Sequence, residues 1–209
     1  MYQEKPKSYG IIAVIYYCIY FLGLLLAGVL FSKNITYGLH ITYCSLFVAG
    51  ILIALIKDKN IYNLGHNKEK WKNNFIVSII IIVGTFIVIL IFSNLPFEKL
   101  LRQMIYYLFY IATIEEILFR GFIQNYLFGF KLNKYLIFII GALFFSFMHI
   151  PFQMFAHNNI SWRYLIDALP NLIETFIAHF IFCFIAYKRK DLLIPIALHY
   201  AYDFLGVII

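Results

Sequence analysis

Charged side chains are scarce in this sequence. Asp, Glu, Lys and Arg together make up only 13% of its 209 residues, whereas apolar residues make up 63% and the mean hydropathy is +0.84. Soluble domains carry about 25% charged and about 45–50% apolar residues. A water-soluble fold of this length could not bury so much apolar surface. The composition therefore excludes an ordinary cytosolic enzyme and a disordered chain.

Cysteine is also rare, with three residues in the chain. Cys18, Cys44 and Cys183 each lie inside an apolar run, and none belongs to a CxxC pair. Disulfide scaffolds and cysteine-ligated metal sites need paired or closely spaced cysteines. We therefore interpret these three as small hydrophobic side chains.

Long apolar runs are what the sequence has in abundance. About 20 apolar residues cross a bilayer as a helix, and backbone groups in lipid must be hydrogen-bonded within the segment. The first run, of about 22 residues, is too long for a secretory signal, so we expect a retained anchor. The sequence predicts an all-α, polytopic transmembrane helical bundle, a single domain over 1–209 with about seven (six to eight) spans. The runs lie at about 10–31, 36–56, 75–95, 104–127, 135–155, 170–187 and 192–209.

Basic residues are shared unevenly between the two sides of these spans. If the spans alternate, twelve Lys and Arg fall on one side: two in the N-terminal head, five in 57–74, two in 128–134 and three in 188–190. Cytoplasmic loops are enriched in Lys and Arg, so we expect a cytoplasmic N-terminus in a bacterial plasma membrane. This clustering indicates topology and a lipid bilayer partner, not nucleic acid, despite the net charge of +7. The four on the other side are Lys33, Lys99, Arg102 and Arg163.

Three of the predicted spans contain ionisable side chains. A charge at the bilayer centre costs about 2.5–3.5 kcal/mol, so such groups tend to mark function. At 1.5 Å of rise per residue their depths agree within roughly 10 Å, so they can meet in one site near the membrane middle. They are Glu115, Glu116 and Arg120 in the fourth span, His149 in the fifth, and His199 and Asp203 in the seventh.

Spacing indicates which of these side chains pair. Glu116 and Arg120 are four residues apart with the acid first, the favourable order for an ion pair within a helix. Glu115 points about 100° away from Glu116 and is left free to act. His199 and Asp203 are also four apart and share a face. Buried pairs can be purely structural, but matching depth on three spans favours a function.

These residues resemble the motifs of the CAAX protease and bacteriocin-processing family of intramembrane proteases, also known as the abortive-infection or type II CAAX endopeptidase family. The motifs occur in family order over the C-terminal half, whereas the first three spans carry no signature. Asp203 stands where asparagine is common, and an ionised Asp only accepts hydrogen bonds, whereas an Asn amide donates. The family motifs EExxxR, FxxxH and HxxxN correspond here to Glu115-Glu116-x-x-x-Arg120, Phe145-x-x-x-His149 and His199-x-x-x-Asp203.

The resemblance implies hydrolysis of a peptide bond in a membrane protein or peptide substrate, with no cofactor and no covalent enzyme intermediate. Glu115, with His149, would hold and deprotonate the attacking water. His199, with Asp203, would stabilise the oxyanion. The supporting residues would be Glu116, Arg120 and Phe145.

Other interpretations stay open. A zinc-dependent protease could use the same histidines and carboxylates, although HExxH is missing. A non-catalytic bacteriocin-immunity or scaffold protein would keep the fold without needing Glu115. A transporter would also place acids and histidines in the membrane, but we find no repeated halves to favour it. Ser146 lies one turn before His149, and such proximity alone is weak support for serine catalysis.

Overall fold

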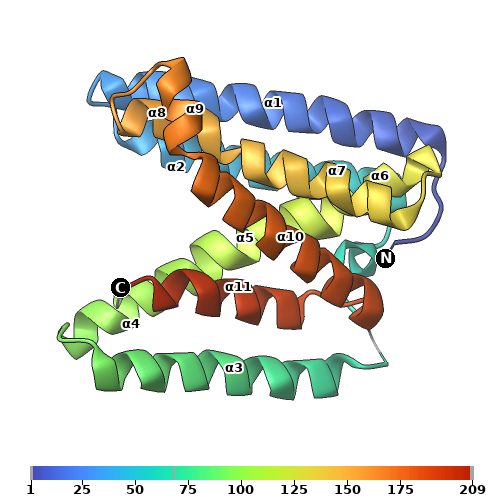
Figure 1. The fold of residues 1–209 in the computed structure, drawn as a ribbon. Helices are drawn as coiled ribbons and strands as arrows, with labels where there is room; N and C mark the ends of the chain where they lie inside the picture. The colour runs from blue at the N-terminus through green and yellow to red at the C-terminus, as the bar shows by residue number, and fades with distance from the viewer. Residues whose placement is uncertain (1, 68, 208–209) are drawn as a thin grey trace.

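The computed structural model describes residues 2–67 and 69–207, and in these ranges the chain is helical with no β-strand (Figure 1). The all-α class expected from hydropathy is confirmed. Elements η1 and η4 are 3-10 turns, and η2 and η3 are π-helical. The bounds are α1 Lys7–Ser32, α2 Tyr37–Asp58, η1 Ile61–Leu64, α3 Trp71–Phe92, α4 Phe97–Ile105, η2 Tyr106–Ala112, α5 Thr113–Glu115, η3 Glu116–Gln124, α6 Asn125–Leu127, η4 Phe128–Phe130, α7 Lys134–Phe147, α8 His149–Ala156, α9 Trp162–Asp167, α10 Leu169–Arg189 and α11 Leu193–Leu205.

Five helical segments are long and apolar enough to cross a membrane: α1, α2, α3, α7 with α8, and α10. Each overlaps one of the predicted spans. The predicted fourth span, 104–127, lies inside an unbroken helical run from 97 to 130, which we call the central rod. The seventh predicted span, 192–209, corresponds to α11, which has 13 residues, fewer than the ~20 residues of a full span. Residues 208–209 of that prediction lie outside the described part.

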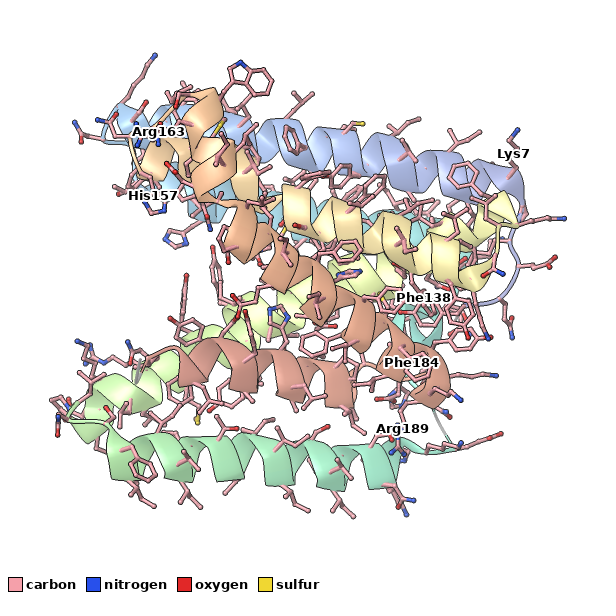
Figure 2. All side chains as sticks on the ribbon, viewed as in Figure 1. Lys7, Phe138, His157, Arg163, Phe184 and Arg189 are labelled. Carbon is pink, nitrogen blue, oxygen red and sulfur yellow. The ribbon has the colours of Figure 1, made fainter. Side chains whose placement is uncertain are left out.

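The helices run back and forth, so their connections gather at two ends of the molecule (Figure 1). The N-terminal head and the connections α2–α3, η4–α7 and α10–α11 share one end, which we call the basic end. Figure 2 shows Lys7 and Arg189 there, and His157 and Arg163 at the opposite end. Of the twelve basic residues predicted to share a side, Lys68 lies outside the described residues, and the other eleven lie in or beside these four segments.

The central rod runs through the middle of the bundle. Its η3 stretch packs on α1, α2, α7 and α10, and its η2 stretch packs on α11. Large side chains of η3, such as Phe119 and Phe122, are at most 1% exposed. Helix α3 packs mainly on α11 at the edge of the bundle. The helix that carries the first motif is therefore surrounded by the helices that carry the other two.

The rod and η1 approach closely at Gly121. A Cβ atom here would overlap the carbonyl oxygen of Leu64 and press on the side chain of Leu192. We expect Gly121→Ala to lower the thermal unfolding midpoint in detergent, because overpacking costs about 1–3 kcal/mol. Gly84→Ala is the matched control, since a Cβ there meets no described atom within 4 Å, and alanine is the better helix former. Equal midpoints for the two variants would contradict the close packing.

Candidate active site

The two adjacent glutamates lie near the middle of the central rod, between two π-helical stretches. Glu115 ends the short α-helical turn α5, and Glu116 begins η3. Single π turns inside helices are frequent at functional sites. Because a π turn holds more residues than an α turn, neighbouring side chains diverge by less than the 100° expected from an α-helix. Both glutamates therefore reach the same neighbour on α11.

That neighbour is His199, which is only 5% exposed. Its Nδ1 lies 2.8 Å from Glu116 Oε1. Its Nε2 lies 3.7 Å from Glu115 Oε2 and 3.4 Å from Asp203 Oδ2. One imidazole thus contacts three carboxyl groups. Spacing in the sequence predicts the contact with Asp203, but not the one with Glu116, which comes from another helix.

The Glu116–Arg120 ion pair expected from spacing is present and fully buried, with Arg120 Nη1 2.7 Å from Glu116 Oε1. The guanidinium also lies over the rings of Phe145 and Phe182, 4.4 and 5.4 Å from their centroids, which adds cation–π attraction. Glu116 is a carboxylate in this ion pair and a carboxylate only accepts hydrogen bonds, so His199 Nδ1 carries the proton in its bond with Glu116. The pair therefore orients the imidazole, with Nε2 turned toward the other two carboxyl groups.

His149 reaches the site from the start of α8. Helix α7 ends at Phe147, because Pro151 in the first turn of α8 has no N–H to continue the hydrogen-bond ladder. His149 Nδ1 lies 2.9 Å from the carbonyl oxygen of Phe145 and 3.3 Å from that of Ser146. Carbonyl oxygens only accept, so Nδ1 carries the proton and Nε2 of the neutral ring is an acceptor. Nε2 can therefore hold a water or a substrate group.

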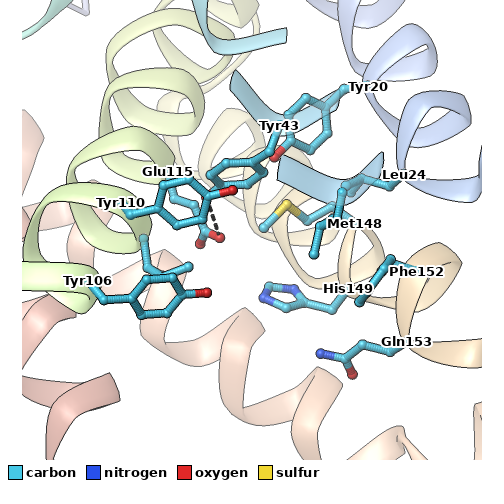
Figure 3. A pocket seen from close by; sticks show the side chains of 12 residues that line it. Tyr20, Leu24, Tyr43, Tyr106, Tyr110, Glu115, Met148, His149, Phe152 and Gln153 are labelled. Atoms are coloured by element: carbon cyan, nitrogen blue, oxygen red, sulfur yellow. Dashed lines mark hydrogen bonds between the residues drawn. The ribbon is translucent and has the colours of Figure 1, made fainter. Parts of the chain in front are cut away.

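Two adjoining cavities join these side chains. The site cavity, of about 70 Å³, is lined by Glu115, His149, His199 and Asp203 among others. A larger chamber of about 260 Å³ shares Glu115 and His149 with it. In Figure 3 the carboxylate of Glu115 and the ring of His149 face the same space. The structure therefore brings together the four residues predicted to be catalytic, and their catalytic role stays a prediction.

Tyr43, on α2, also contacts the site. Its hydroxyl donates a hydrogen bond of 2.9 Å to Glu115 Oε1 (dashed in Figure 3) and is almost fully buried. No sequence signal singles it out, because it is one of 17 tyrosines and lies outside the three motifs. The bond fixes one oxygen of Glu115 and leaves Oε2 on the side of His199.

Ser146 takes no part in this arrangement. Its hydroxyl donates to the carbonyl oxygen of Leu172 at 2.6 Å, and the hydroxyl of Thr175 lies 3.3 Å away. Both partners lie on α10, and the hydroxyl proton of Ser146 is donated to a carbonyl oxygen and not to His149. The serine–histidine alternative is therefore set aside.

Side chains that could bind a metal ion are the last feature of the site. Within the described ranges, no cluster of three or more His, Cys, Asp or Glu side chains has the geometry to hold a metal ion. The three cysteines are free thiols: Cys18 and Cys44 are exposed on the outer faces of α1 and α2, and Cys183 is buried. The zinc alternative is addressed by experiment below.

Removing the phenol hydroxyl tests the role of Tyr43. A hydrogen bond to a charged group is worth about 1.5–3 kcal/mol, so Tyr43→Phe should lower kcat/KM for the peptide cleavage that the resemblance implies by about tenfold or more. Tyr110→Phe is the matched control, because Tyr110 lines the same chamber but bonds to His40. Similar rates for the two variants would show that Tyr43 does not position Glu115.

Comparison with protein families supports the resemblance seen in the motifs. The family described as type II CAAX prenyl endopeptidase, Rce1-like, matches residues 96–205, just over half of the chain. This range contains the whole central rod and all three motifs. No curated protein and no solved structure gives a match. With its apolar spans, the chain is a multi-pass membrane protein, and it belongs to the Rce1-like family of type II CAAX prenyl endopeptidases.

Proposed function

We propose that this protein is an intramembrane endopeptidase that hydrolyses a peptide bond of a membrane-associated protein or peptide with a water molecule activated at Glu115. Membership of a protease family supplies the reaction class. The observation that supports the mechanism is that Glu115, His149 and His199 line one small buried cavity. A nucleophile, a base and an oxyanion donor can be assigned there without a covalent intermediate.

Glu115 is the general base in this proposal. Tyr43 holds Oε1, and Oε2 takes one proton from a water molecule. The second hydrogen atom of this water is donated to Nε2 of His149. The water oxygen then bonds to the scissile carbonyl carbon. As the carbon–nitrogen bond breaks, Glu115 passes the proton to the leaving amine, which restores the carboxylate.

His199, protonated on both ring nitrogens, stabilises the oxyanion through Nε2–H. Its Nδ1–H is engaged by Glu116, so Nε2 is the ring nitrogen directed to the cavity. Donors placed where charge develops are usually the largest single contribution to catalysis. Glu116 and Arg120 do not touch the substrate in this scheme, and they act by orienting His199.

Asp203 acts as a hydrogen-bonding partner beside Nε2 of His199. In this proposal the negative charge of its carboxylate is not required for catalysis. Asp203→Asn, which introduces the residue common in the family, should keep the cleavage rate within about tenfold of the wild type. Asp203→Ala should lower kcat by about 10²–10³, because Nε2 of His199 is then no longer held where the oxyanion forms. An asparagine variant as inactive as the alanine variant would mean that the carboxylate charge itself is required.

The decisive test of the base is Glu115→Gln in purified protein reconstituted in liposomes. The probe is a quenched fluorescent peptide that ends in a farnesylated CAAX sequence. Loss of a general base should lower kcat by about 10²–10⁴, whereas Glu98→Gln, an exposed acid on the same rod, should cleave like the wild type. Wild-type cleavage by Glu115→Gln would rule out this mechanism.

The same assay separates the remaining alternatives. A zinc chelator should leave the rate unchanged, whereas loss of cleavage that added zinc restores would support the zinc-dependent protease. In cells, the Glu115→Gln strain should accumulate an uncut membrane or secreted precursor. A biological effect that persists undiminished in that strain would favour the non-catalytic immunity or scaffold protein.

We also propose that the protein lies in a bacterial plasma membrane with the basic end in the cytoplasm. The support is the gathering of Lys- and Arg-rich connections at one end of the bundle (Figure 1), which is typical of cytoplasmic loops. The N-terminus is then cytoplasmic, and the end that carries α9 faces the outside.

A further inference from the structure

Helix α9 lies in the connection between two membrane-spanning segments. The span formed by α7 and α8 ends at Ala156, and the span of α10 begins at Leu169. Helix α9 lies between them, at the end of the bundle opposite the basic end (Figure 1). The reaction scheme above uses none of its side chains. A connection of this kind lies beside the lipid headgroups unless it stands away from them in water.

The outer face of α9 is apolar. Trp162 is 84% exposed, and Ile166, one turn later, is 72% exposed. They are the two most exposed large apolar side chains among the residues that the structure describes. Ile160, just before the helix, is 62% exposed. Moving such a side chain from water into an apolar environment is favourable by about 1.5–3 kcal/mol, so water is the less favourable surrounding for this face.

The inner face of α9 is polar. Tyr164 is only 6% exposed, and its hydroxyl donates to Gln153 Oε1 on α8 at 3.2 Å. Asp167 lines a cavity of about 410 Å³ together with His157 and Asn171. A helix on the surface of a water-soluble protein has the opposite arrangement, with its apolar side inward and its polar side outward. The polarity of α9 therefore indicates an apolar surrounding outside the bundle.

The apolar face of α9 continues onto the lipid-facing side of α10. Ile166 is followed by Leu169, Ile173 and Ile177, each 51% exposed, at spacings of three and four residues that keep to one face of a helix. The backbone stays helical through Ala168, with φ −80° and ψ −12°. Because α10 is long and apolar enough to span the membrane, its exposed apolar face contacts lipid. The same lipid surface therefore extends to α9.

We propose that α9 is an interfacial anchor, which lies at the bilayer surface with Trp162 and Ile166 inserted between the lipid headgroups and the upper acyl chains. Helices of this kind bury their apolar face about 5–10 Å into the boundary between headgroups and acyl chains. Tryptophan is enriched at this level of membrane proteins, because its ring is apolar and its N–H is polar. Arg163 lies between the two apolar residues and is exposed, and a long basic side chain extends toward the headgroups from such a position.

The anchor is joined to the helix that carries His149. The hydrogen bond between Tyr164 and Gln153 connects α9 to α8, and α8 begins at His149, about 10 Å of helix from Ala156. An anchor held at the bilayer surface therefore limits how far this end of the active site moves relative to the lipid.

Tryptophan fluorescence tests the position of α9 directly, because the chain has only two tryptophans. Trp71→Phe leaves Trp162 as the single tryptophan in purified protein reconstituted in phosphatidylcholine liposomes. The matched control is His157→Trp combined with Trp71→Phe and Trp162→Phe, since His157 is exposed at the same end but lines the polar cavity. The quenchers are iodide on both sides of the bilayer, and lipids brominated near either the headgroup end or the methyl end of the acyl chain.

We expect Trp162 to be quenched most strongly by the lipid brominated near the headgroup and only weakly by iodide, whereas the His157→Trp control should show the reverse. Iodide quenching of Trp162 as strong as in the control, without quenching by brominated lipid, would place α9 in water and overturn the anchor. Strongest quenching by bromine at the methyl end would place α9 in the hydrocarbon core and overturn its interfacial position.

A charge on the apolar face tests whether that face holds α9 in lipid. In the Trp71→Phe background, Ile166→Asp should raise the iodide quenching of Trp162 several-fold, because a charged side chain opposes insertion. Asp167→Asn changes the next residue, on the cavity side, and should leave the quenching unchanged. Equal iodide quenching in the two variants would show that the face carrying Ile166 does not contact lipid, and it would overturn the anchor.

Discussion

The carboxylate of Glu116 is the interaction on which the rest of the site depends. It is fully buried and receives both Arg120 Nη1 and His199 Nδ1 on one oxygen. In a low-dielectric interior an unpaired carboxylate is strongly unfavourable, by about 3–5 kcal/mol when one partner of a buried pair is removed. The central rod and α11 are therefore held at a fixed distance, and the imidazole of His199 has one favoured orientation. The position of Nε2 beside Glu115 follows from that constraint.

The shape of the bundle turns this local contact into a site within the membrane. The central rod is wrapped by the helices that carry the other motifs, so polar groups from three spans meet away from lipid. Lipid cannot satisfy backbone groups, and Pro151 and the π-helical stretches are tolerated because they lie inside protein or beside a cavity. The departures from regular α-helix thus occur where the reacting groups are, next to His149 and around Glu115.

Hydropathy and motif spacing predicted much of this arrangement, for physical reasons that are local. Long apolar runs define spans, and a spacing of four residues brings Glu116 to Arg120 whatever lies around them. Contacts between helices could not be predicted in the same way. The Tyr43–Glu115 bond depends on how α2 packs on the rod, and nothing near Tyr43 in the sequence marks it. The second role of Glu116, as partner of His199, was missed for the same reason, because it depends on how α11 packs on the rod.

The central claim is that Glu115 and the two histidines act on one water molecule. The most direct measurement is an experimental structure of the protein in lipid, at a resolution that shows ordered water. The account predicts a water in the site cavity within hydrogen-bonding distance of both Glu115 Oε2 and His149 Nε2, with His199 Nε2 on its far side. A dry site cavity, or a Glu115 side chain turned to the hydrocarbon and away from both histidines, would contradict it.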